Sequence, residues 1–356
     1  MAVKASGHLE ILPKKFGFLR SIHNNFRPSQ EDIFVPGPLI HQFSLQEGMF
    51  IEGTAEETNE KPKLDKIKKI NGLSVSKANK IINLRQLVSI NPEDHLNICL
   101  GPDDRLGKII NFVTPIGRGQ RGLIIAPPKT GKTTIIKHAA KAAEESSSNI
   151  KVYCILIDER PEEVTDFRRS LGEDSIVLWS SADESTESHL RMTRLAMHSA
   201  MREAEFGNDV FIVIDSLTRM ARAFNKDTEN YGRTLSGGLA ANALELPRRF
   251  FGAARNIESG GSLSILATIL IDTGSVMDEV IFREFQGTGN LDLYLSRVCA
   301  EQRIFPAINI GKSGTRKEEL ILSEEEYKKV IKIRRILAEM NETEAMIYLN
   351  EHWREL

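Results

Sequence analysis

The feature that most constrains this 356-residue chain is residues 122–134, which read G-L-I-I-A-P-P-K-T-G-K-T-T. Leu123–Ile125 form an apolar run that predicts a buried strand, and Pro127 and Pro128 end it. A helical pattern begins after Gly131. A strand, a loop and a helix in this order point backbone N–H groups and a helix N-terminus at an anion. The sequence therefore predicts a phosphate loop and a nucleoside triphosphate site.

Each polar residue at the end of this loop has an expected contact. Lys132 would reach the β and γ phosphates of the nucleotide, and the Thr133 hydroxyl would ligate Mg²⁺. Ala126 stands where the usual pattern begins with glycine, and G-K-T alone could be an ordinary turn before a helix. The strand before it and the helix after it favour the phosphate loop. The residues expected to contact the nucleotide here are Lys129, Thr130, Gly131, Lys132, Thr133 and Thr134.

Two predicted strands end in carboxylates. Val210–Ile214 runs into Asp215, the expected position of an acid that holds Mg²⁺ through water. The strand Val152–Ile157 runs into Asp158-Glu159-Arg160. We assign to Glu159 the orientation and polarisation of the water that attacks the γ phosphate, and Arg160 would contact that phosphate.

The same acidic cluster also has a purely structural interpretation. Asp158 and Glu162 can begin the next helix, where negative charge complements the helix dipole. For Glu162 and Glu163 we favour that interpretation, whereas for Glu159 and Asp215 we favour chemistry.

Composition fits a soluble intracellular protein. Hydrophobic residues make up 41% and charged residues 27% of the chain, and the net charge is −2. Nucleic-acid binding would therefore need local basic patches rather than bulk charge. Cys99, Cys154 and Cys299 show no metal-ligand spacing and fit a reducing cytoplasm. No apolar run approaches the roughly 18–20 residues of a membrane span, and the N-terminus has no signal-peptide pattern.

The chain divides into three expected regions. Residues 1–70 alternate short apolar runs with turn residues, which predicts a small OB-fold or cold-shock-like β-barrel. Residues 71–105 are mixed and are interpreted as a linker. Residues 106–356 alternate strands and helices, which predicts an α/β domain with a mainly parallel sheet covered by helices on both faces. Its expected strands include Val152–Ile157, Ile176–Trp179, Val210–Ile214 and Leu263–Ile271, and its expected helices Thr133–Glu145, Glu187–Glu205, Ser216–Asn225 and Ser323–Leu356.

Aromatic residues of the predicted barrel suggest an RNA site. Phe16, Phe18 and Arg20 alternate, so they share one face of a strand, and Phe26 follows downstream. Exposed rings stack on single-stranded bases. The alternative is that these phenylalanines form the barrel core. The residues expected to bind RNA here are Lys15, Phe16, Gly17, Phe18, Leu19, Arg20, Asn24, Asn25 and Phe26.

Long motifs resemble the bacterial transcription termination factor Rho family. They are P-I-G-R-G-Q-R-G at 115–122, A-P-P-K-T-G-K-T at 126–133, D-E-R-P-E-E-V-T at 158–165, R-R-F-F-G-A-A-R-N at 248–256, I-D-T-G-S at 271–275 and S-G-T-R-K-E-E-L at 313–320. The resemblance implies a homohexameric ring of RecA-like ATPase domains that draws RNA through its pore. It also implies release of transcripts from RNA polymerase, tuned by elongation factors.

The resemblance assigns roles residue by residue. It implies that Glu159 is the catalytic glutamate, Arg160 a γ-phosphate sensor and Asp215 a metal-associated acid. It also implies that Arg316 is an arginine finger supplied across a subunit boundary, although alone Arg316 could be a solvated charge. Arg303 matches a second inter-subunit arginine, and Phe305 an aromatic that stacks on adenine. We also expect cofactor contacts from Gly117, Arg118, Gly119, Gln120, Arg121 and Gly122.

Two loops match the family's RNA contacts inside the pore. Asp227–Gly238 contains Tyr231 and Arg233, the latter where the family commonly has lysine. Asp272–Glu279 has Val276 where the family typically presents a lysine. Because phosphate contacts dominate RNA affinity and its salt dependence, we expect weaker or more salt-sensitive coupling of RNA to hydrolysis.

Two further departures separate this chain from the family pattern. The strand near Lys63 and Leu64 lacks an aromatic often found there, so pyrimidine preference at that subsite is open. The basic helical segment that usually precedes the barrel is also missing from this sequence, whether naturally or by truncation.

Three functions remain to be weighed. The leading hypothesis is an RNA-dependent ATPase and 5′-to-3′ RNA translocase or helicase that terminates transcription. A second is a non-motor RNA-binding protein that uses ATP only to close a ring, motivated by Val276 and the missing basic segment. A third is a RecA-type rotary or DNA motor, against which the barrel aromatics and the 313–320 loop weigh.

Overall fold

The computed structural model describes residues 2–58, 61–146, 149–228, 236–240 and 242–356. Its N-terminal part is a small barrel with the strand order β3-β2-β1-β4-β5-β6. The pair Phe34 and Lys63 joins β3 to β5 and closes the barrel. The predicted β-barrel is therefore confirmed. Its strands are β1 (Ala2–Ile11), β2 (Gly17–Arg20), β3 (Ile33–Val35), β4 (Phe50–Glu56), β5 (Lys63–Ile70) and β6 (Leu73–Ser74).

Alternation along the strands fills the barrel. Leu9, Leu19, Ile51 and Leu64 point inward and are buried in one hydrophobic core. A Cβ on Gly17 would lie 2.3 Å from the Glu10 carbonyl oxygen, so only glycine permits this approach of β1 and β2. Short elements complete the barrel and lead out of it: η1 (Ile22–Asn24), α1 (Gly37–Gln42), α2 (Val75–Ala78), η2 (Leu84–Gln86) and β7 (Ser89–Ile90).

The second part is built on a large sheet, mostly parallel as predicted. The main path runs β10-β9-β11-β13-β8-β14-β15, and its first six strands are parallel to their neighbours. Antiparallel pairing occurs at the margins, where β15 joins β14 and β12 joins β13. The strands are β8 (Arg121–Ala126), β9 (Ile150–Glu159), β10 (Ile176–Ser181), β11 (Asp209–Asp215), β12 (Arg255–Ile257), β13 (Ser262–Leu270), β14 (Leu291–Tyr294) and β15 (Gly314–Thr315).

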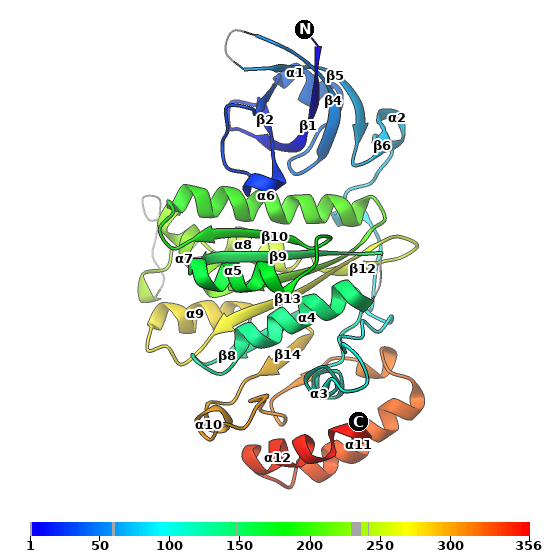
Figure 1. The fold of residues 1–356 in the computed structure, drawn as a ribbon, viewed down its shortest axis with the longest axis vertical. Coiled ribbons are helices and arrows are strands. Elements are labelled where there is room, and N and C mark those ends of the chain that lie inside the picture. Colours follow the sequence, from blue (N-terminus) through cyan, green and yellow to red (C-terminus); the bar gives the residue numbers. More distant parts are fainter. Residues whose placement is uncertain (1, 59–60, 147–148, 229–235, 241) are drawn as a thin grey trace.

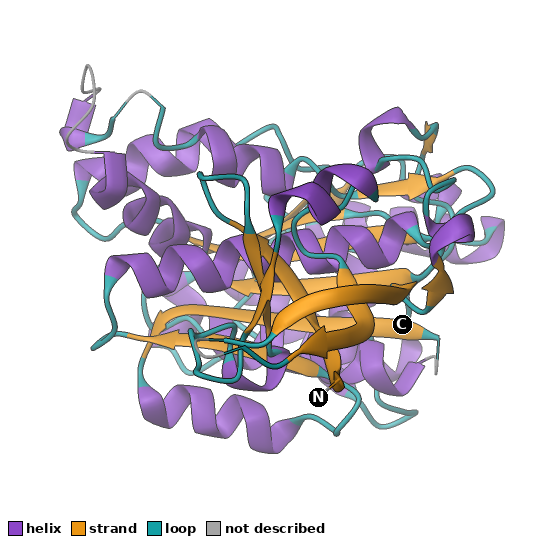
Figure 2. Cartoon of the chain, turned by 90° about the horizontal axis from the view of Figure 1, so that it is seen from above, coloured by secondary structure: helices purple, strands orange, loops and turns teal. Residues whose placement is uncertain are grey.

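Helices cover both faces of this sheet, as Figure 2 shows along the long axis. In β8, Leu123 and Ile125 pack into one hydrophobic core, whereas Ile124 and Ala126 pack into the other. The first core is covered by α6 (Thr186–Glu205), α7 (Leu217–Thr228), α8 (Glu245–Phe251) and α9 (Val276–Phe285). The second core is covered by α3 (Arg105–Val113), α4 (Lys132–Ser146) and α5 (Pro161–Ser170).

The C-terminal stretch is helical, as expected, but in two pieces. A capping box begins α11 (Glu324–Leu337) at Ser323, and another begins α12 (Glu342–His352) at Asn341. Both helices pack into the second core. The remaining short elements are η3 (Ser236–Gly238), α10 (Arg297–Glu301), η4 (Glu318–Leu320) and η5 (Trp353–Glu355).

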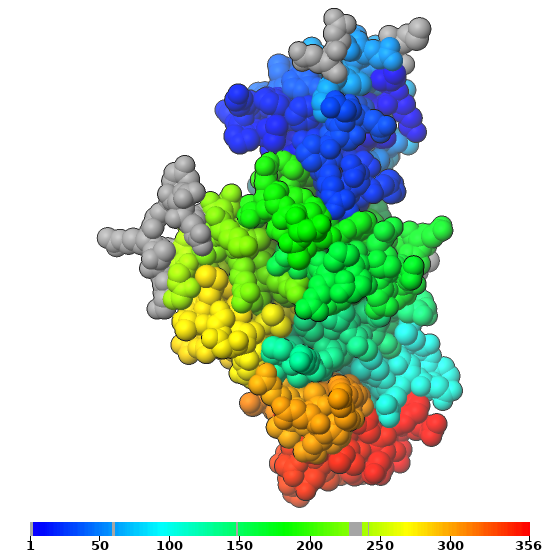
Figure 3. All heavy atoms as spheres, turned by 60° about the vertical axis from the view of Figure 1, so that its left-hand side comes forward, coloured from blue at the N-terminus to red at the C-terminus, as the bar shows by residue number. Residues whose placement is uncertain are grey.

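The barrel rests on α6, which lies between it and the large sheet (Figure 1). The buried Glu10 carboxylate of β1 accepts a hydrogen bond from Arg191 of α6 at 3.0 Å. Figure 3 shows the barrel at one end of the molecule and the C-terminal helices at the other. Among the described helices, none combines the length and the apolar character that crossing a membrane requires.

Candidate functional site

The predicted phosphate loop connects the carboxyl end of β8 to the first turn of α4. Lys129 and Gly131 both have positive φ, 66° and 92°, and the Thr130 hydroxyl donates to the Pro127 carbonyl at 2.7 Å. Gly131 suits the left-handed conformation because it has no Cβ. The loop thus turns the chain directly into a helix whose N-terminal N–H groups are free to meet an anion.

Three predicted residues converge beside this loop. The Lys132 ammonium nitrogen lies 2.7 Å from both carboxylate oxygens of Asp215 and 3.8 Å from Glu159 Oε1. Both carboxylates are buried, and the Thr268 hydroxyl donates to Asp215 at 2.8 Å. The strand ends therefore place two acids and one lysine in a single site, as the sequence indicated.

Sequence reasoning missed Arg219, which completes this cluster. Arg219 lies on α7, its Nη1 is 3.0 Å from Glu159 Oε1, and the same nitrogen donates to the Asp158 carbonyl. It stands one helical turn after Asp215, so its position at the end of the strand was a usable signal. Arg219 holds the Glu159 carboxylate in place.

Burial shifts the protonation of Glu159. It raises the pKa of this carboxyl to about 7, with repulsion from Asp215 adding to the rise and Arg219 and Lys132 opposing it. A carboxylate with a pKa near neutrality is well suited to accept a proton from water. The environment therefore fits the general-base role expected for Glu159.

The residues present also fit a magnesium ion. Thr133 begins α4 next to Lys132, whose ammonium lies 3.4 Å from the Thr133 hydroxyl and also contacts Asp215. Hydroxyl and carboxylate oxygens are the donors that Mg²⁺ prefers, usually together with water and phosphate oxygens. Among the described residues, no group of three or more His, Cys, Asp or Glu side chains is arranged to hold a metal ion.

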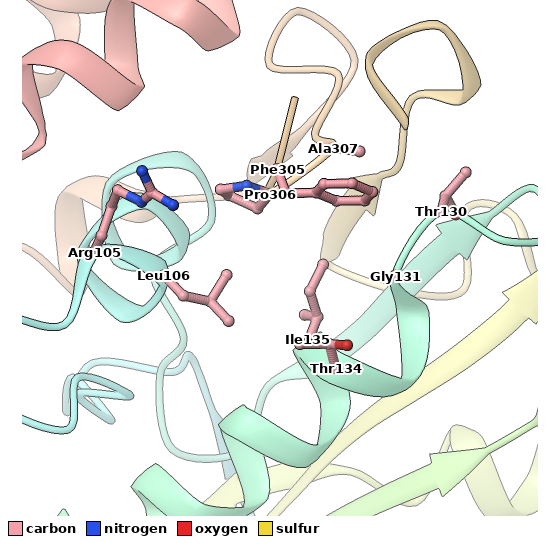
Figure 4. A pocket seen from close by; sticks show the side chains of 9 residues that line it. All are labelled: Arg105, Leu106, Thr130, Gly131, Thr134, Ile135, Phe305, Pro306 and Ala307. Carbon is pink, nitrogen blue, oxygen red and sulfur yellow. The ribbon is translucent and has the colours of Figure 1, made fainter. Parts of the chain in front are cut away.

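An apolar cavity of about 360 Å³ adjoins the loop (Figure 4). Phe305, whose side chain is 40% exposed, forms one wall, and Thr130 and Ile135 lie opposite. A flat base can stack on the Phe305 ring here while its phosphates reach the loop. Arg105 and Leu106 from the start of α3 also line the cavity, and sequence reasoning missed both.

Other predicted nucleotide contacts are solvent-exposed. Lys129 is exposed on the loop, and Thr134 is exposed in the first turn of α4. Arg160 precedes α5, and its only ion-pair contact within the described chain is Glu163, at 3.9 Å. These side chains are free to reorient toward a bound nucleotide.

The structure does not bring residues 117–122, from which cofactor contacts were expected, to the phosphate loop of their own chain. These residues lie at the amino end of β8, whereas the phosphate loop follows its carboxyl end. The six residues of β8 span five steps of about 3.3 Å, which places the two ends of the strand roughly 16 Å apart. The polar groups of these residues stabilise the fold. The Gly119 N–H donates to Ser264, and Arg118 forms an ion pair with Asp209. Gln120 and Arg121 donate to Asn290 or to nearby carbonyl groups, and Gly117 and Gly122 are closely packed.

Arg316 also lies at this remote end of β8. It follows β15, is exposed, and its backbone N–H donates to the Asn290 carbonyl at 2.9 Å. Asn290 in turn accepts from the Arg121 N–H at the start of β8. Arg316 therefore cannot reach the phosphate loop of its own chain. Arg303 is also exposed, two residues before Phe305.

The barrel carries a compact aromatic cluster. Phe16 and Phe18 are half-buried, with ring centroids 5.9 Å apart, and Phe34 of β3 lies 5.5 and 5.8 Å from them. Phe34, which pairs directly with Phe18, was not among the predicted RNA-binding residues. The Lys61 ammonium, 5.3 Å from the Phe18 ring centre, adds a cation. Lys15, which precedes Phe16 in the sequence, and Asn24 are both solvent-exposed.

Several predicted RNA contacts are instead structural. Leu19 lies in the barrel core, and Phe26 is fully buried with His8 where the barrel meets α6. Arg20 does share a face with Phe18, but Glu10 and Asp32 neutralise it. Buried Asn25 accepts from the Trp179 N–H at 3.1 Å. The RNA-binding prediction is therefore corrected for Leu19, Arg20, Asn25 and Phe26. Gly17 also has a structural role, because it allows the close approach of β1 and β2.

Of the residues predicted to contact RNA in the two pore loops, the structure describes only Val276. Tyr231 and Arg233 lie outside the described residues. Val276 is 58% exposed at the start of α9, after the capping Ser275. A Cβ on Gly237 would lie 2.8 Å from the Met277 N–H nitrogen, so η3 and the start of α9 are adjacent.

Comparisons with known proteins match both halves of the chain. Residues 107–315 match the ATP synthase alpha/beta family, nucleotide-binding domain, and residues 5–76 match the Rho termination factor, RNA-binding domain. An ATPase from the type III secretion system of pathogenic bacteria aligns with a TM-score of 0.64 at 21% identity, over 84% of this chain and 82% of that one. At that identity the likeness concerns the fold alone.

Relatives in other bacteria match nearly the whole chain. The transcription termination factor Rho of Aquifex aeolicus is 44% identical over 99% of this chain and 82% of that protein. The Rho of Thermotoga maritima is 46% identical over 96% and 80%, and that of Karelsulcia muelleri 44% over 94% and 89%. With a phosphate loop, a buried glutamate and an aromatic barrel face in place, the chain belongs to the Rho family of transcription termination factors.

Proposed function

We propose that this chain is an RNA-dependent ATPase that moves along RNA in the 5′-to-3′ direction and releases nascent transcripts from RNA polymerase. The observation that best supports this proposal is that one chain contains both the aromatic cluster Phe16–Phe18–Phe34 and a phosphate loop beside Glu159. Family membership supports both halves of the proposal. Elongation factors are expected partners, and the site of action is the cytoplasm, where bacterial transcripts are made.

The site residues divide the hydrolysis between them. When ATP binds, Lys132 exchanges Asp215 for the β and γ phosphates. The Glu159 carboxylate takes a proton from water as the water oxygen bonds to the γ phosphorus and the bond to the β-phosphate oxygen breaks. A magnesium ion held by Thr133, and by Asp215 through water, would neutralise developing phosphate charge. Phe305 would stack on the base.

The active form is a homohexameric ring in this proposal. Arg316 is anchored at the end of β8 remote from its own loop, so it can serve only the nucleotide of a neighbouring subunit. An added guanidinium stabilises charge on the transferring phosphoryl group. Arg303 would be a second arginine at that subunit boundary, and Arg160 would contact the γ phosphate. RNA held by the barrel and the pore loops at Tyr231, Arg233 and Val276 would favour this arrangement.

ATP turnover with and without poly-cytidine RNA tests the proposal, together with the mass of the assembly. We expect RNA to stimulate hydrolysis, a hexamer to form, and Glu159→Gln to abolish turnover while nucleotide binding persists. Equal hydrolysis with and without several RNAs would contradict the proposal.

The exposed Val276 favours one alternative, a non-motor protein that uses ATP only to close around RNA. The two functions differ in whether ATP drives displacement of RNA from a duplex. Displacement supports the translocase, and hydrolysis without displacement supports the alternative.

A further inference from the structure

Two adjoining cavities form a groove where the barrel meets the ATPase domain. Their volumes are about 430 and 340 Å³, and both are lined by Leu84, Arg85, Met201 and Arg249. Gln46 of the barrel lines the first cavity, and Arg255 of β12 lines the second. We call this surface the Arg85–Arg249 groove. It is continuous from the barrel, past η2 and α6, to α8 and β12.

Positive charge in the groove is largely uncompensated. Arg85 and Arg249 are exposed, and neither makes an ion pair or a side-chain hydrogen bond within the described part of the chain. The Arg255 guanidinium donates only to the backbone carbonyls of Leu84, Gly252 and Ala253, which are neutral acceptors. Among the described residues, no carboxylate therefore forms an ion pair with any of these three arginines.

The acids near the groove are already engaged. Glu205 lies 2.9 Å from Arg202 and accepts from the Leu84 N–H at 2.7 Å. Glu47 lies 2.9 Å from Arg194. Each of these carboxylates is therefore paired directly with an arginine other than Arg85, Arg249 and Arg255, and Arg249 acts on Glu47 only without direct contact.

The arginines of the groove also lower the pKa values of His198 and Arg255 by electrostatic repulsion. Burial, followed by repulsion from Arg202, Arg249, Arg194 and Arg85, lowers the pKa of His198 to about 3. The pKa of Arg255 is lowered by burial and then by repulsion from Arg121 and Arg85. Cations this close repel one another, and an anion in the groove would relieve that repulsion.

The chemistry of the walls identifies the anion. Guanidinium groups match phosphate oxygens with paired hydrogen bonds. Among the described residues, no Phe, Tyr or Trp lines either cavity, so these walls can hold a phosphate backbone but offer no aromatic ring on which bases could stack. We propose that the Arg85–Arg249 groove binds the phosphodiester backbone of single-stranded RNA between the barrel and the ATPase domain. This rests on the proposed function, because it requires that the chain binds RNA.

Salt-dependent RNA binding tests the inference. The full chain, without nucleotide, is titrated against a fluorescent oligocytidine long enough to extend beyond the barrel, over a series of salt concentrations. For single-stranded RNA, removing one phosphate contact lowers the slope of log K against log salt by about 0.7. We expect Arg85→Gln/Arg249→Gln to lower the slope by about 1.4 and to weaken binding several-fold at low salt. Arg85→Lys/Arg249→Lys should largely restore both.

A matched control uses Arg335→Gln, since Arg335 is an exposed arginine of α11 at the opposite end of the molecule. It should leave the slope unchanged. Thermal unfolding and assembly mass are compared for all variants. A double variant that loses assembly would show instead that the groove is an interface between copies, which overturns the inference.

Two further outcomes separate this inference from the proposed function. If Phe18→Ala weakens RNA binding but the double variant keeps the full slope, the groove inference fails and the RNA-binding function stands. If wild type does not bind RNA, the proposed function fails as well. Inorganic tripolyphosphate is tested in a Lys132→Ala background. If adding Arg85→Gln/Arg249→Gln to this background weakens tripolyphosphate binding, while the salt slope of RNA binding is unchanged by the double variant, the groove binds a small polyphosphate and not RNA.

Discussion

Lys132 contacts Asp215 through both carboxylate oxygens, each 2.7 Å from its ammonium nitrogen. Glu159 lies beside this pair and is paired with Arg219, so two cations offset the two buried carboxylates. In the proposed function, the phosphates of ATP would replace Asp215 as the partner of Lys132. Lys132 therefore stabilises the loop through Asp215 with the same ammonium that is proposed to bind phosphate.

Lys132→Ala should leave Asp215 buried without its cation. We expect loss of ATP turnover and a loss of unfolding free energy of roughly 3 kcal/mol, the lower end of the range for breaking a buried pair. Adding Asp215→Asn removes the unpaired charge and should recover most of that stability without restoring turnover. Denaturant unfolding of the two variants measures this, and equal stability of both would contradict the assigned pair.

The raised pKa of Glu159 makes stability depend on pH. Its folded-state pKa of about 7 exceeds the ordinary value of 4.5, so the folded protein holds a proton that the unfolded chain releases. The resulting stabilisation is complete below pH 4.5 and is lost as pH rises through 7. Glu159→Gln, which mimics the protonated acid, should lack this decline. Melting temperatures of both proteins from pH 5 to 8 give the comparison, and parallel curves would argue against the shift.

Phe34 should contribute to RNA binding as is expected of Phe18, because their rings lie 5.8 Å apart on one face. Removing one stacking ring typically costs about 1–3 kcal/mol of RNA affinity. We expect Phe34→Ala and Phe18→Ala each to weaken oligocytidine binding accordingly. Phe26→Ala is the contrasting control: it should cost about 3–5 kcal/mol of stability as a buried ring, while the stacking rings of the cluster stay in place. Full RNA affinity in Phe34→Ala would exclude this ring from the site.

Val276→Lys should strengthen the coupling between RNA and hydrolysis. Val276 is 58% exposed at the start of α9, so a lysine fits there without disturbing the core and adds a phosphate contact. RNA-stimulated ATP turnover should rise and become less sensitive to salt. Ile347→Lys, at another exposed apolar position on α12, serves as the control and should change neither. An unchanged response in Val276→Lys would mean that this position is not the limiting contact.

Local patterns predicted the fold where apolar runs were bounded by Gly, Pro or charged residues. Leu123–Ile125 and Val210–Ile214 are of this kind, and each became a central strand. The acids at the strand ends followed from the geometry of parallel sheets, so Glu159 and Asp215 were placed correctly beside Lys132. In β14, the polar Asp292 interrupts a short strand, Leu291–Tyr294, which was not predicted.

The remaining errors concern partners distant in sequence. Burial of Phe26 requires the barrel to dock on α6, and neutralisation of Arg20 requires Glu10 and Asp32. Gly117 to Arg121 adjoin the phosphate-loop motif in sequence, yet a strand carries the two to opposite edges of the sheet. Neither result can be read from spacing, because each depends on which surfaces meet in three dimensions.

Mixing two inactive variants tests the central claim most directly. Lys132→Ala should remove nucleotide binding from its own site, and Arg316→Ala should remove the arginine that is proposed to serve a neighbour. In mixed assemblies, some boundaries join an intact Lys132 of one subunit to an intact Arg316 of the next. We predict that RNA-stimulated ATP turnover, absent from each variant alone, reappears on mixing. Confirmed co-assembly without any recovered turnover, or full activity of Arg316→Ala alone, would contradict the account.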